Sequence, residues 1–278
     1  MKSIALIGTY LPRKCGIATF TADLSAAILD NDPEIDCSIV AMNDRPDGHE
    51  YPESVRFQID QDQLNQYDLA ASFLNLKNPD TYRENIKTAA KALLSGQIVA
   101  FPTETVYGLG VCADNKDAID NLYRVKQRSR DKKLSIMIAR TEDITKYVKY
   151  IPSIAEKLIS SFWPGPLTII FKASQMVPNL ITGDTGKVGI RIPGCPFTRK
   201  MIREVGFPMV GTSANLSGKP GAMEIKPIQQ DFGDRVDLYL DVGRLDPGEP
   251  STVVDLTGEK LVVVREGMIG MDQLKNVK

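Results

Sequence analysis

The chain has 278 residues, of which 42% are hydrophobic and 25% are charged, and its formal net charge is −1. This composition is typical of globular proteins, and the length allows one large domain or two smaller ones. The charge gives no general attraction to nucleic acid or membranes, and no apolar run approaches the ~20 residues of a membrane span. The N-terminal run "MKSIALIGTY" predicts a first strand rather than a signal peptide, so we expect a cytoplasmic location.

The cysteines and the one histidine exclude two classes of site. Cys15, Cys37, Cys112 and Cys195 are widely spaced, with no Cys-x-x-Cys pair, so a structural zinc site is not expected. His49 stands in the turn-rich stretch "RPDGHEYPES", which favours a solvated loop. Any catalysis is therefore expected to proceed without histidine as acid or base.

The first 75 residues predict a partial Rossmann-like segment. Apolar runs predict strands at 4–7, 37–44 and 55–59, and apolar residues at helical spacing predict a helix over 18–29. Strand, loop, helix and strand form the opening of a doubly wound sheet. Three strands and two helices would make a thin core for independent stability.

A polar stretch at 76–84 predicts a linker, and a second domain is expected over 85–272. The next helix has Asp80 or Thr81 as its predicted N-cap and Gly96 as its C-terminal stop. A strand over 98–101 follows and ends at Pro102.

Further along the chain, helical and strand patterns alternate. Helices are predicted at 115–126, 152–163 and 197–206, and strands at 134–139, 167–172, 188–193 and 208–215, with two more around a turn within 251–267. The terminal hairpin is antiparallel, so we expect an α/β domain with a twisted mixed sheet and flanking helices.

Two glycine-rich stretches match nucleotide-binding fingerprints only formally. Residues 108–113 fit Gly-x-Gly-x-x-Ala, but Pro102 and five more residues separate the first glycine from the strand, so we interpret the stretch as a tight turn. The segment "GDTGK" at 183–187 lacks both the first glycine and the final serine or threonine of a phosphate loop.

The run "KQRSRDKK" at 126–133 carries five cations in eight residues: Lys126, Arg128, Arg130, Lys132 and Lys133. Cations at a helix C-terminus are favoured by the helix dipole, so a solvated face is one interpretation. The position between a helix and a buried strand favours the other, in which the cations converge on a triphosphate.

Short polar side chains follow the strand predicted at 208–215. The stretch "GTSANLSGKPG" contains Thr212, Ser213, Asn215 and Ser217, which predict either a capped turn or a ring of uncharged donors for a carboxylate or phosphate. Arg191 alternates with Ile190 and Ile192 on one strand, so it is expected at a cavity mouth. Arg265 ends the last strand after four apolar residues, which fits either a site lining or a solvent edge.

Seven motifs in order resemble the YrdC/YciO family, specifically its threonylcarbamoyl-AMP synthases. They are "FPTETVYGLG", "KQR", "FWPGPLT", "VGIRIP", "TSANLSG", "STVVD" and "VVREG", over roughly residues 82–270, a full domain by size. The resemblance implies a YrdC-like fold around a basic cavity. It implies an enzyme, a nucleotidyltransferase, that joins L-threonine, bicarbonate and ATP, with Mg²⁺ accompanying the ATP, into threonylcarbamoyl-AMP and pyrophosphate. The product would serve N6-threonylcarbamoyladenosine formation on tRNA through partner proteins.

The resemblance also implies the site residues. The catalytic tetrad would be Lys126, Arg128, Ser213 and Asn215; L-threonine would contact Thr105, Arg191, Ser213 and Ser251; ATP would contact Lys126, Arg128, Lys132, Asn215 and Arg265. No metal ligand among the protein side chains is predicted. Two positions depart from the family pattern, because Lys132-Lys133 stands where many members have Asn-Pro and Met137 where they have histidine.

Alternatives remain open at this level. A YciO-like protein, or a module of the same fold that grips double-stranded RNA or tRNA by its phosphates, would share these motifs. The N-terminal stretches "IALIGTYLPRKCGIATFTADL" and "YDLAASFLN" resemble the start of a GT-B glycosyltransferase of family 4 type, truncated near Leu76. Because such enzymes bind the donor in a second domain, this remnant is expected to lack transferase activity.

Overall fold

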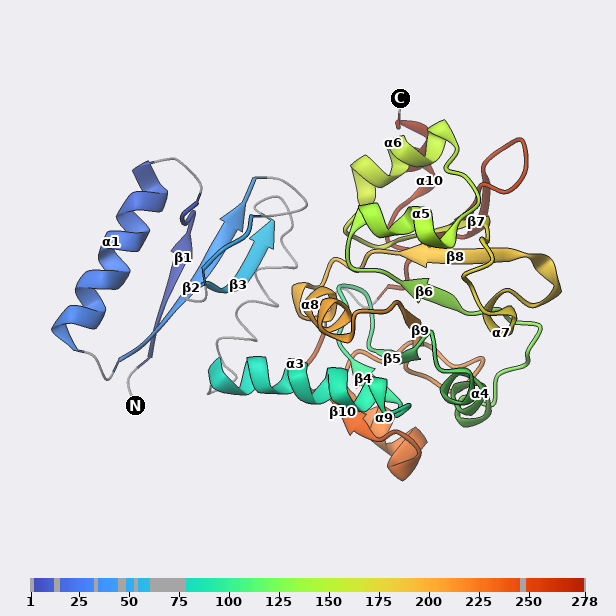
Figure 1. The fold of residues 1–278 in the computed structure, drawn as a ribbon, viewed down its shortest axis with the longest axis horizontal. Coiled ribbons are helices and arrows are strands. Elements are labelled where there is room, and N and C mark those ends of the chain that lie inside the picture. Colours follow the sequence, from blue (N-terminus) through green and yellow to red (C-terminus); the bar gives the residue numbers. More distant parts are fainter. Residues whose placement is uncertain are drawn as a thin grey trace. The chain divides into compact units, whose positions relative to one another are not determined.

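The structure is a computed structural model that describes residues 3–12, 16–32, 35–44, 49–52, 55–60, 79–245 and 249–277. The chain divides into two compact units, Met1–Arg83 and Glu84–Lys278, which Figure 1 shows in ribbon form. The division falls inside the predicted linker at 76–84. Residues 76–78 of that stretch lie outside the described ranges, and from Pro79 onward it is helix rather than linker.

The first unit contains the predicted strand–helix–strand segment. Its elements are β1 (Ser3–Gly8), α1 (Gly16–Asn31), β2 (Asp36–Asn43) and β3 (Val55–Asp60). The strands form a parallel sheet in the order β1-β2-β3, and Tyr10, Ile39, Ala41 and Val55 make up a small core. The stretch "YDLAASFLN" of the glycosyltransferase resemblance lies outside the described residues, so that resemblance stays a prediction.

The second unit is built on a nine-stranded mixed sheet in the order β10-β4-β5-β9-β6-β8-β7-β11-β12 (Figure 1). Its strands are β4 (Val99–Phe101), β5 (Gly108–Cys112), β6 (Ser135–Met137), β7 (Leu167–Lys172), β8 (Lys187–Arg191), β9 (Met209–Ser213), β10 (Leu238–Tyr239), β11 (Thr252–Asp255) and β12 (Val262–Arg265). Parallel and antiparallel pairs alternate irregularly, as the prediction of a mixed sheet requires.

The helices of the second unit flank this sheet. They are α3 (Pro79–Leu94), α4 (Lys116–Val125), α5 (Ile144–Tyr147), α6 (Ser153–Phe162), α7 (Asn179–Thr182), α8 (Pro196–Val205), α9 (Ile225–Phe232) and α10 (Met271–Lys275), with single 3₁₀ turns at Thr141–Asp143, Gly183–Thr185 and Gly233–Arg235. Within the described residues, none of the helices combines the length and the apolarity needed to cross a bilayer.

Local sequence explains where the helices around the site begin and end. Asn115 caps α4 because its Oδ1 accepts a hydrogen bond from Ala118 N at 3.0 Å. Pro196 opens α8, and Gly206 closes it with φ of 75°, a left-handed conformation that suits glycine. Gly96 stops α3 in the same way with φ of 81°, as predicted.

The interpretation of residues 108–113 as a tight turn was wrong. Gly108–Cys112 is β5, a fully buried strand that pairs antiparallel with β4 on one side and with β9 on the other. A Cβ at Gly108 would lie 2.8 Å from Phe101 Cζ, and one at Gly110 would lie 2.7 Å from Phe101 Cε1. The two glycines are therefore required by the Phe101 ring on the neighbouring strand, since only a residue without a side chain leaves room for it.

Candidate functional site

Strand ends and loops of the second unit surround a cavity of about 610 Å³, a size typical of small-molecule sites. Its walls come from the β4–β5 loop, the segment before β6, strands β6 to β9, and the β11–β12 pair. Six of the nine predicted site residues line it: Thr105, Arg128, Arg191, Ser213, Ser251 and Arg265. Residues more than 150 positions apart in sequence therefore meet in one place.

Three arginines, together with Lys133 and Lys187, give the cavity its positive charge. Arg128 is held by its own loop, since Nε donates to Lys132 O at 2.8 Å and Nη2 to Lys133 O at 2.9 Å. Desolvation, followed by the charges of Arg191 and Arg128, lowers the pKa of Arg265. A bound anion would relieve this mutual repulsion.

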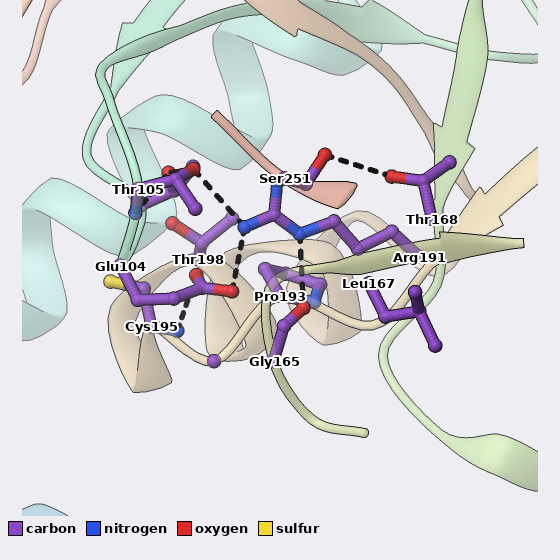
Figure 2. A network of polar contacts seen from close by, with 12 residues as sticks. Glu104, Thr105, Gly165, Leu167, Thr168, Arg191, Pro193, Cys195, Thr198 and Ser251 are labelled. Carbon is purple, nitrogen blue, oxygen red and sulfur yellow. Dashed lines mark hydrogen bonds and ion pairs between the residues drawn. The ribbon is translucent and has the colours of Figure 1, made fainter. Parts of the chain in front are cut away.

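Arg191 is the most constrained of the three (Figure 2). Its Nη2 donates to Glu104 Oε1 at 2.7 Å and to Thr105 Oγ1 at 3.1 Å, and its Nε donates to Gly165 O at 3.1 Å. These contacts use three of the five guanidinium N–H groups. Among the described residues Nη1 has no hydrogen-bond partner, and its two N–H groups remain for a ligand in the cavity. The placement of Arg191 by strand alternation at a cavity is confirmed.

The Thr-Glu-Thr sequence at 103–105 forms a directed chain of hydroxyl groups. Thr103 Oγ1 donates to Val106 O at 2.7 Å, so the proton between Thr103 Oγ1 and Thr105 Oγ1, 2.7 Å apart, belongs to Thr105. Thr105 Oγ1 in turn accepts from Arg191 Nη2. The hydrogen bonds run in one direction, from Arg191 through Thr105 and Thr103 to the backbone carbonyl of Val106, and so fix the orientation of both hydroxyl groups. Water is not needed to satisfy these buried groups.

On the other side of Arg191, Ser251 joins two further cavity residues (Figure 2). Ser251 Oγ lies 3.1 Å from Thr168 Oγ1 and accepts from Arg265 Nη2 at 3.1 Å. Arg265 Nη2 also donates to Ser251 O at 2.8 Å, and the two hydrogen bonds fix the guanidinium group of Arg265 at the cavity. Thr168 was not among the predicted site residues. Its position beside Arg191 depends on strand pairing, which a linear pattern does not reveal.

The structure places Lys126 behind the cavity wall, contrary to the expectation that it reaches phosphates directly. The residue is 1% exposed, and Nζ donates to Asn215 O at 2.6 Å and to Ser213 O. Burial, with a smaller effect of Arg128, lowers the pKa of Lys126 to about 7. Lys126 therefore braces the loop that presents Ser213 to the cavity.

Asn215 has a similar supporting position rather than a place on the cavity lining. Its Nδ2 donates to Leu216 O at 3.0 Å and to Lys219 O, and its Oδ1 accepts from Ser213 Oγ. All its amide groups hold the loop over 213–219 in shape. A hydrogen bond from Nδ2 to an ATP phosphate, which would be a direct contact as the resemblance implies, would require one of the two Nδ2 bonds to open.

Lys132 does not line the cavity either, and the neighbouring Lys133 does. Arg128 donates hydrogen bonds to the backbone carbonyls of both lysines. We interpret the resulting turn as the reason why the side chain of Lys133, and not that of Lys132, faces the cavity. Lys133 Nζ donates to Arg130 O at 3.0 Å and lies close to Gly183, where a Cβ would be 1.9 Å away. Which of the two adjacent lysines lines the cavity therefore depends on this turn, and the composition of the run at 126–133 does not reveal it.

Met137, which stands where the resemblance implies a histidine, lines the cavity at the end of β6. Its Cε would lie 2.7 Å from a Cβ at Gly211, so the methionine fills the space above a glycine of β9. The residues that line the cavity include no carboxylate, and the described residues contain no group of three or more His, Cys, Asp or Glu suited to a metal ion.

Comparison with known proteins fits this fold and site. The Sua5/YciO/YrdC family model, described as "Telomere recombination", matches residues 91–267, and the chain therefore belongs to this family. A threonylcarbamoyl-AMP synthase of Pyrococcus abyssi is 38% identical over 69% of this chain and 56% of its own length.

Two solved structures share the fold. The crystal structure of P. abyssi Sua5 complexed with L-threonine has a TM-score of 0.67 at 38% identity, and covers 69% of this chain and 56% of that one. The structure of Escherichia coli YciO has a TM-score of 0.64 at 27% identity, and covers 69% of this chain and 93% of that one. This chain thus spans little more than half of the P. abyssi proteins but nearly all of YciO.

Proposed function

We propose that this protein is an L-threonylcarbamoyladenylate synthase, a nucleotidyltransferase that joins L-threonine, bicarbonate and ATP. The observation that carries the proposal is the pairing of two kinds of subsite in one cavity. Arg191 and neutral hydroxyls suit an amino acid, and Arg128, Lys133 and Arg265 suit phosphates. The name of the P. abyssi relative and the L-threonine in the Sua5 crystal structure support it.

In this proposal the amino acid lies beside Arg191. Its carboxylate meets the two N–H groups of Nη1, and the hydroxyl groups of Thr105 and Ser251 flank it. Ser213, at the end of β9, faces the amine or carbamate from the loop that Lys126 braces. Fixed neutral donors around the reacting atoms lower the reorganisation needed as charge develops.

The nucleotide phosphates would lie among Arg128, Lys133 and Arg265. Because no carboxylate of the described residues lines the cavity, Mg²⁺ would enter as the ATP complex, held by phosphate oxygens. Arg128 and Arg265 both have lowered pKa values from desolvation, so phosphate charge stabilises their ionised forms.

The chemistry follows from this arrangement without histidine. The threonine amine adds to the carbon of bicarbonate and water leaves, which gives a carbamate. A carbamate oxygen then forms a bond to the α-phosphorus of ATP, and the bond to pyrophosphate breaks. The protein contributes alignment and neutralisation of the phosphates, which account for most catalysis of phosphoryl transfer. The product would go to tRNA modification through cytoplasmic partner proteins.

Pyrophosphate release tests the proposal. We expect release that requires L-threonine, bicarbonate and ATP together, since each supplies a part of the product. Arg128→Ala should lower kcat/KM by about 100-fold or more, the scale of removing a transition-state donor. Arg124→Ala is the matched control, because Arg124 is exposed, contacts Asn121 and does not line the cavity. Release without threonine, or equal rates for both variants, would contradict the proposal.

A further inference from the structure

Glu104 lies just outside the cavity and connects three segments of the chain (Figure 2). Its side chain is 3% exposed, and its two oxygens have different partners. Oε1 accepts from Arg191 Nη2 at 2.7 Å, and Oε2 accepts from Cys195 N at 3.2 Å, beside the start of α8. A single carboxylate therefore ties the β4–β5 loop to β8 and to the entry of α8.

A carboxylate this deeply buried is costly unless it is paired. Burial acts to raise the pKa of Glu104, but the charge and hydrogen bond of Arg191, helped by backbone donors, prevail and lower it. The chain also makes room for the group: a Cβ at Gly194 would lie 2.9 Å from Glu104 Cδ. The pair is thus ionised and closely packed.

The geometry of the guanidinium gives this pair a consequence in the cavity. The guanidinium group is planar, so hydrogen bonds donated by Nε and Nη2 fix the direction of Nη1 as well. Glu104, Thr105 and Gly165 supply these fixed partners. Of the three, Glu104 alone carries a charge, and charge-assisted bonds are roughly twice as strong as neutral ones.

We propose that Glu104 is a positioning residue, which holds the Arg191 guanidinium so that both N–H groups of Nη1 face the cavity and receive the carboxylate of the amino-acid substrate. The inference rests on the proposed function and adds a residue to it. The carboxylate would contact one guanidinium nitrogen, and neighbouring hydroxyl groups would complete its coordination.

The test substitutes Glu104→Gln, which keeps the shape but not the charge. The amide must turn its NH₂ toward either Arg191 or Cys195 N, so one of these donors loses its acceptor. We expect KM for L-threonine to rise at least tenfold, with KM for ATP changed less than threefold. Calorimetry should show the same weakening of L-threonine binding.

Thr198→Val is the matched control. Thr198 is fully buried, and its Oγ1 donates to Pro102 O at 2.6 Å, which fastens α8 to the same loop without a hydrogen bond to Arg191. The Thr198→Val protein should have a lower free energy of unfolding, but its KM for L-threonine and its KM for ATP should stay within threefold of those of the unchanged protein. Gly194→Ala is a second variant that retains the charge and displaces the carboxylate, and it should raise KM for L-threonine as Glu104→Gln does.

The outcomes separate the two claims. If the unchanged protein binds no L-threonine, the proposed function fails and this inference with it. The other outcome begins with an unchanged protein that binds L-threonine. If Glu104→Gln and Gly194→Ala then leave KM for L-threonine unchanged, or raise KM for L-threonine and KM for ATP equally, Glu104 is only a structural anchor. Should Glu104→Gln fail to fold, Gly194→Ala decides between these results.

Discussion

Burial gives Lys126 a different role from the one that its charge suggested. In the sequence it begins a run of five cations, which favoured a contact with phosphates. In the structure its Nζ has carbonyl partners on both sides of Ala214, and its pKa falls to about 7 because of burial. A neutral amine can still donate two hydrogen bonds, so the brace does not depend on the charge.

This pKa shift predicts a dependence of stability on pH. Between pH 7 and 10.5 the unfolded chain keeps the proton on Lys126, and the folded chain has lost it. Since the unfolded state binds more protons there, the free energy of unfolding should rise with pH, by at most about 1.4 kcal/mol per pH unit for one proton. Urea unfolding at pH 7.5 and 9.5, followed by fluorescence of the buried Trp163, measures this rise.

Lys126→Met is the comparison for this prediction. The variant keeps the length of the side chain but has no titrating group, so the rise between the two pH values should be smaller by the Lys126 contribution. An identical rise in both proteins would contradict the assigned pKa. The absolute stability of the variant should fall, because the carbonyls of Ser213 and Asn215 lose the hydrogen bonds from Lys126 Nζ.

Some site residues could be predicted at the residue level and others could not. Alternation along a strand was sufficient to place Arg191 on the cavity side, because that rule is local. The choice of Lys133 over Lys132 depends on two backbone carbonyls that Arg128 binds. The role of Glu104 depends on Arg191 and Cys195, some 90 residues away, which no local pattern contains.

At the scale of elements, sequence reasoning missed two strands of the second unit, β5 and the two-residue β10. The segment Gly-Leu-Gly-Val-Cys has two glycines in five residues, and glycine weakens a strand unless something packs against it. Phe101 provides that packing from β4. Helices α3, α4 and α8 were easier to predict, since Asn115, Gly96 and Gly206 act within one turn of the element they limit, whereas α5, α7, α9 and α10 were not predicted.

The close packing at β5 predicts the effect of adding one methyl group. In Gly110→Ala the new Cβ would lie 2.7 Å from Phe101 Cε1 and 2.9 Å from Val210 O, and the backbone oxygen cannot move away alone. We expect the free energy of unfolding to fall by about 1–3 kcal/mol, as for other overpacked cores.

Urea unfolding with Trp163 fluorescence measures this change too. Gly258→Ala is the control, because a Cβ there would meet nothing within 4 Å, and it should stay within about 0.5 kcal/mol of the parent. If Gly110→Ala were as stable as this control, glycine would not be required for the packing of β5 on Phe101.

At the scale of the whole molecule, the fold class was predictable but the sheet order was not. Alternating helices and strands with a terminal hairpin indicated a mixed α/β sheet. However, β9 lies between β5 and β6, so strands distant in sequence become neighbours and bring Ser213 to the cavity. Such pairing is set by long-range packing, and in this protein it assembles the whole site.

All the cavity residues belong to the second unit, and the described part of the first unit supplies none of them. The match to nearly the full length of E. coli YciO also indicates that this domain occurs largely by itself in a relative. The account therefore assigns the chemistry to the part of the chain that begins with α3 at Pro79.

Formation of the labelled product is the most direct test of this central claim. The whole chain and a shorter chain of residues 79–278 would each be incubated with L-threonine, ATP and ¹³C-bicarbonate, and the products followed by mass spectrometry. We predict an AMP adduct that contains threonine and one ¹³C atom, formed at similar rates by both chains. Absence of this adduct from both would contradict the assignment of the enzyme, and its formation by the whole chain alone would contradict the confinement of the site to the second unit.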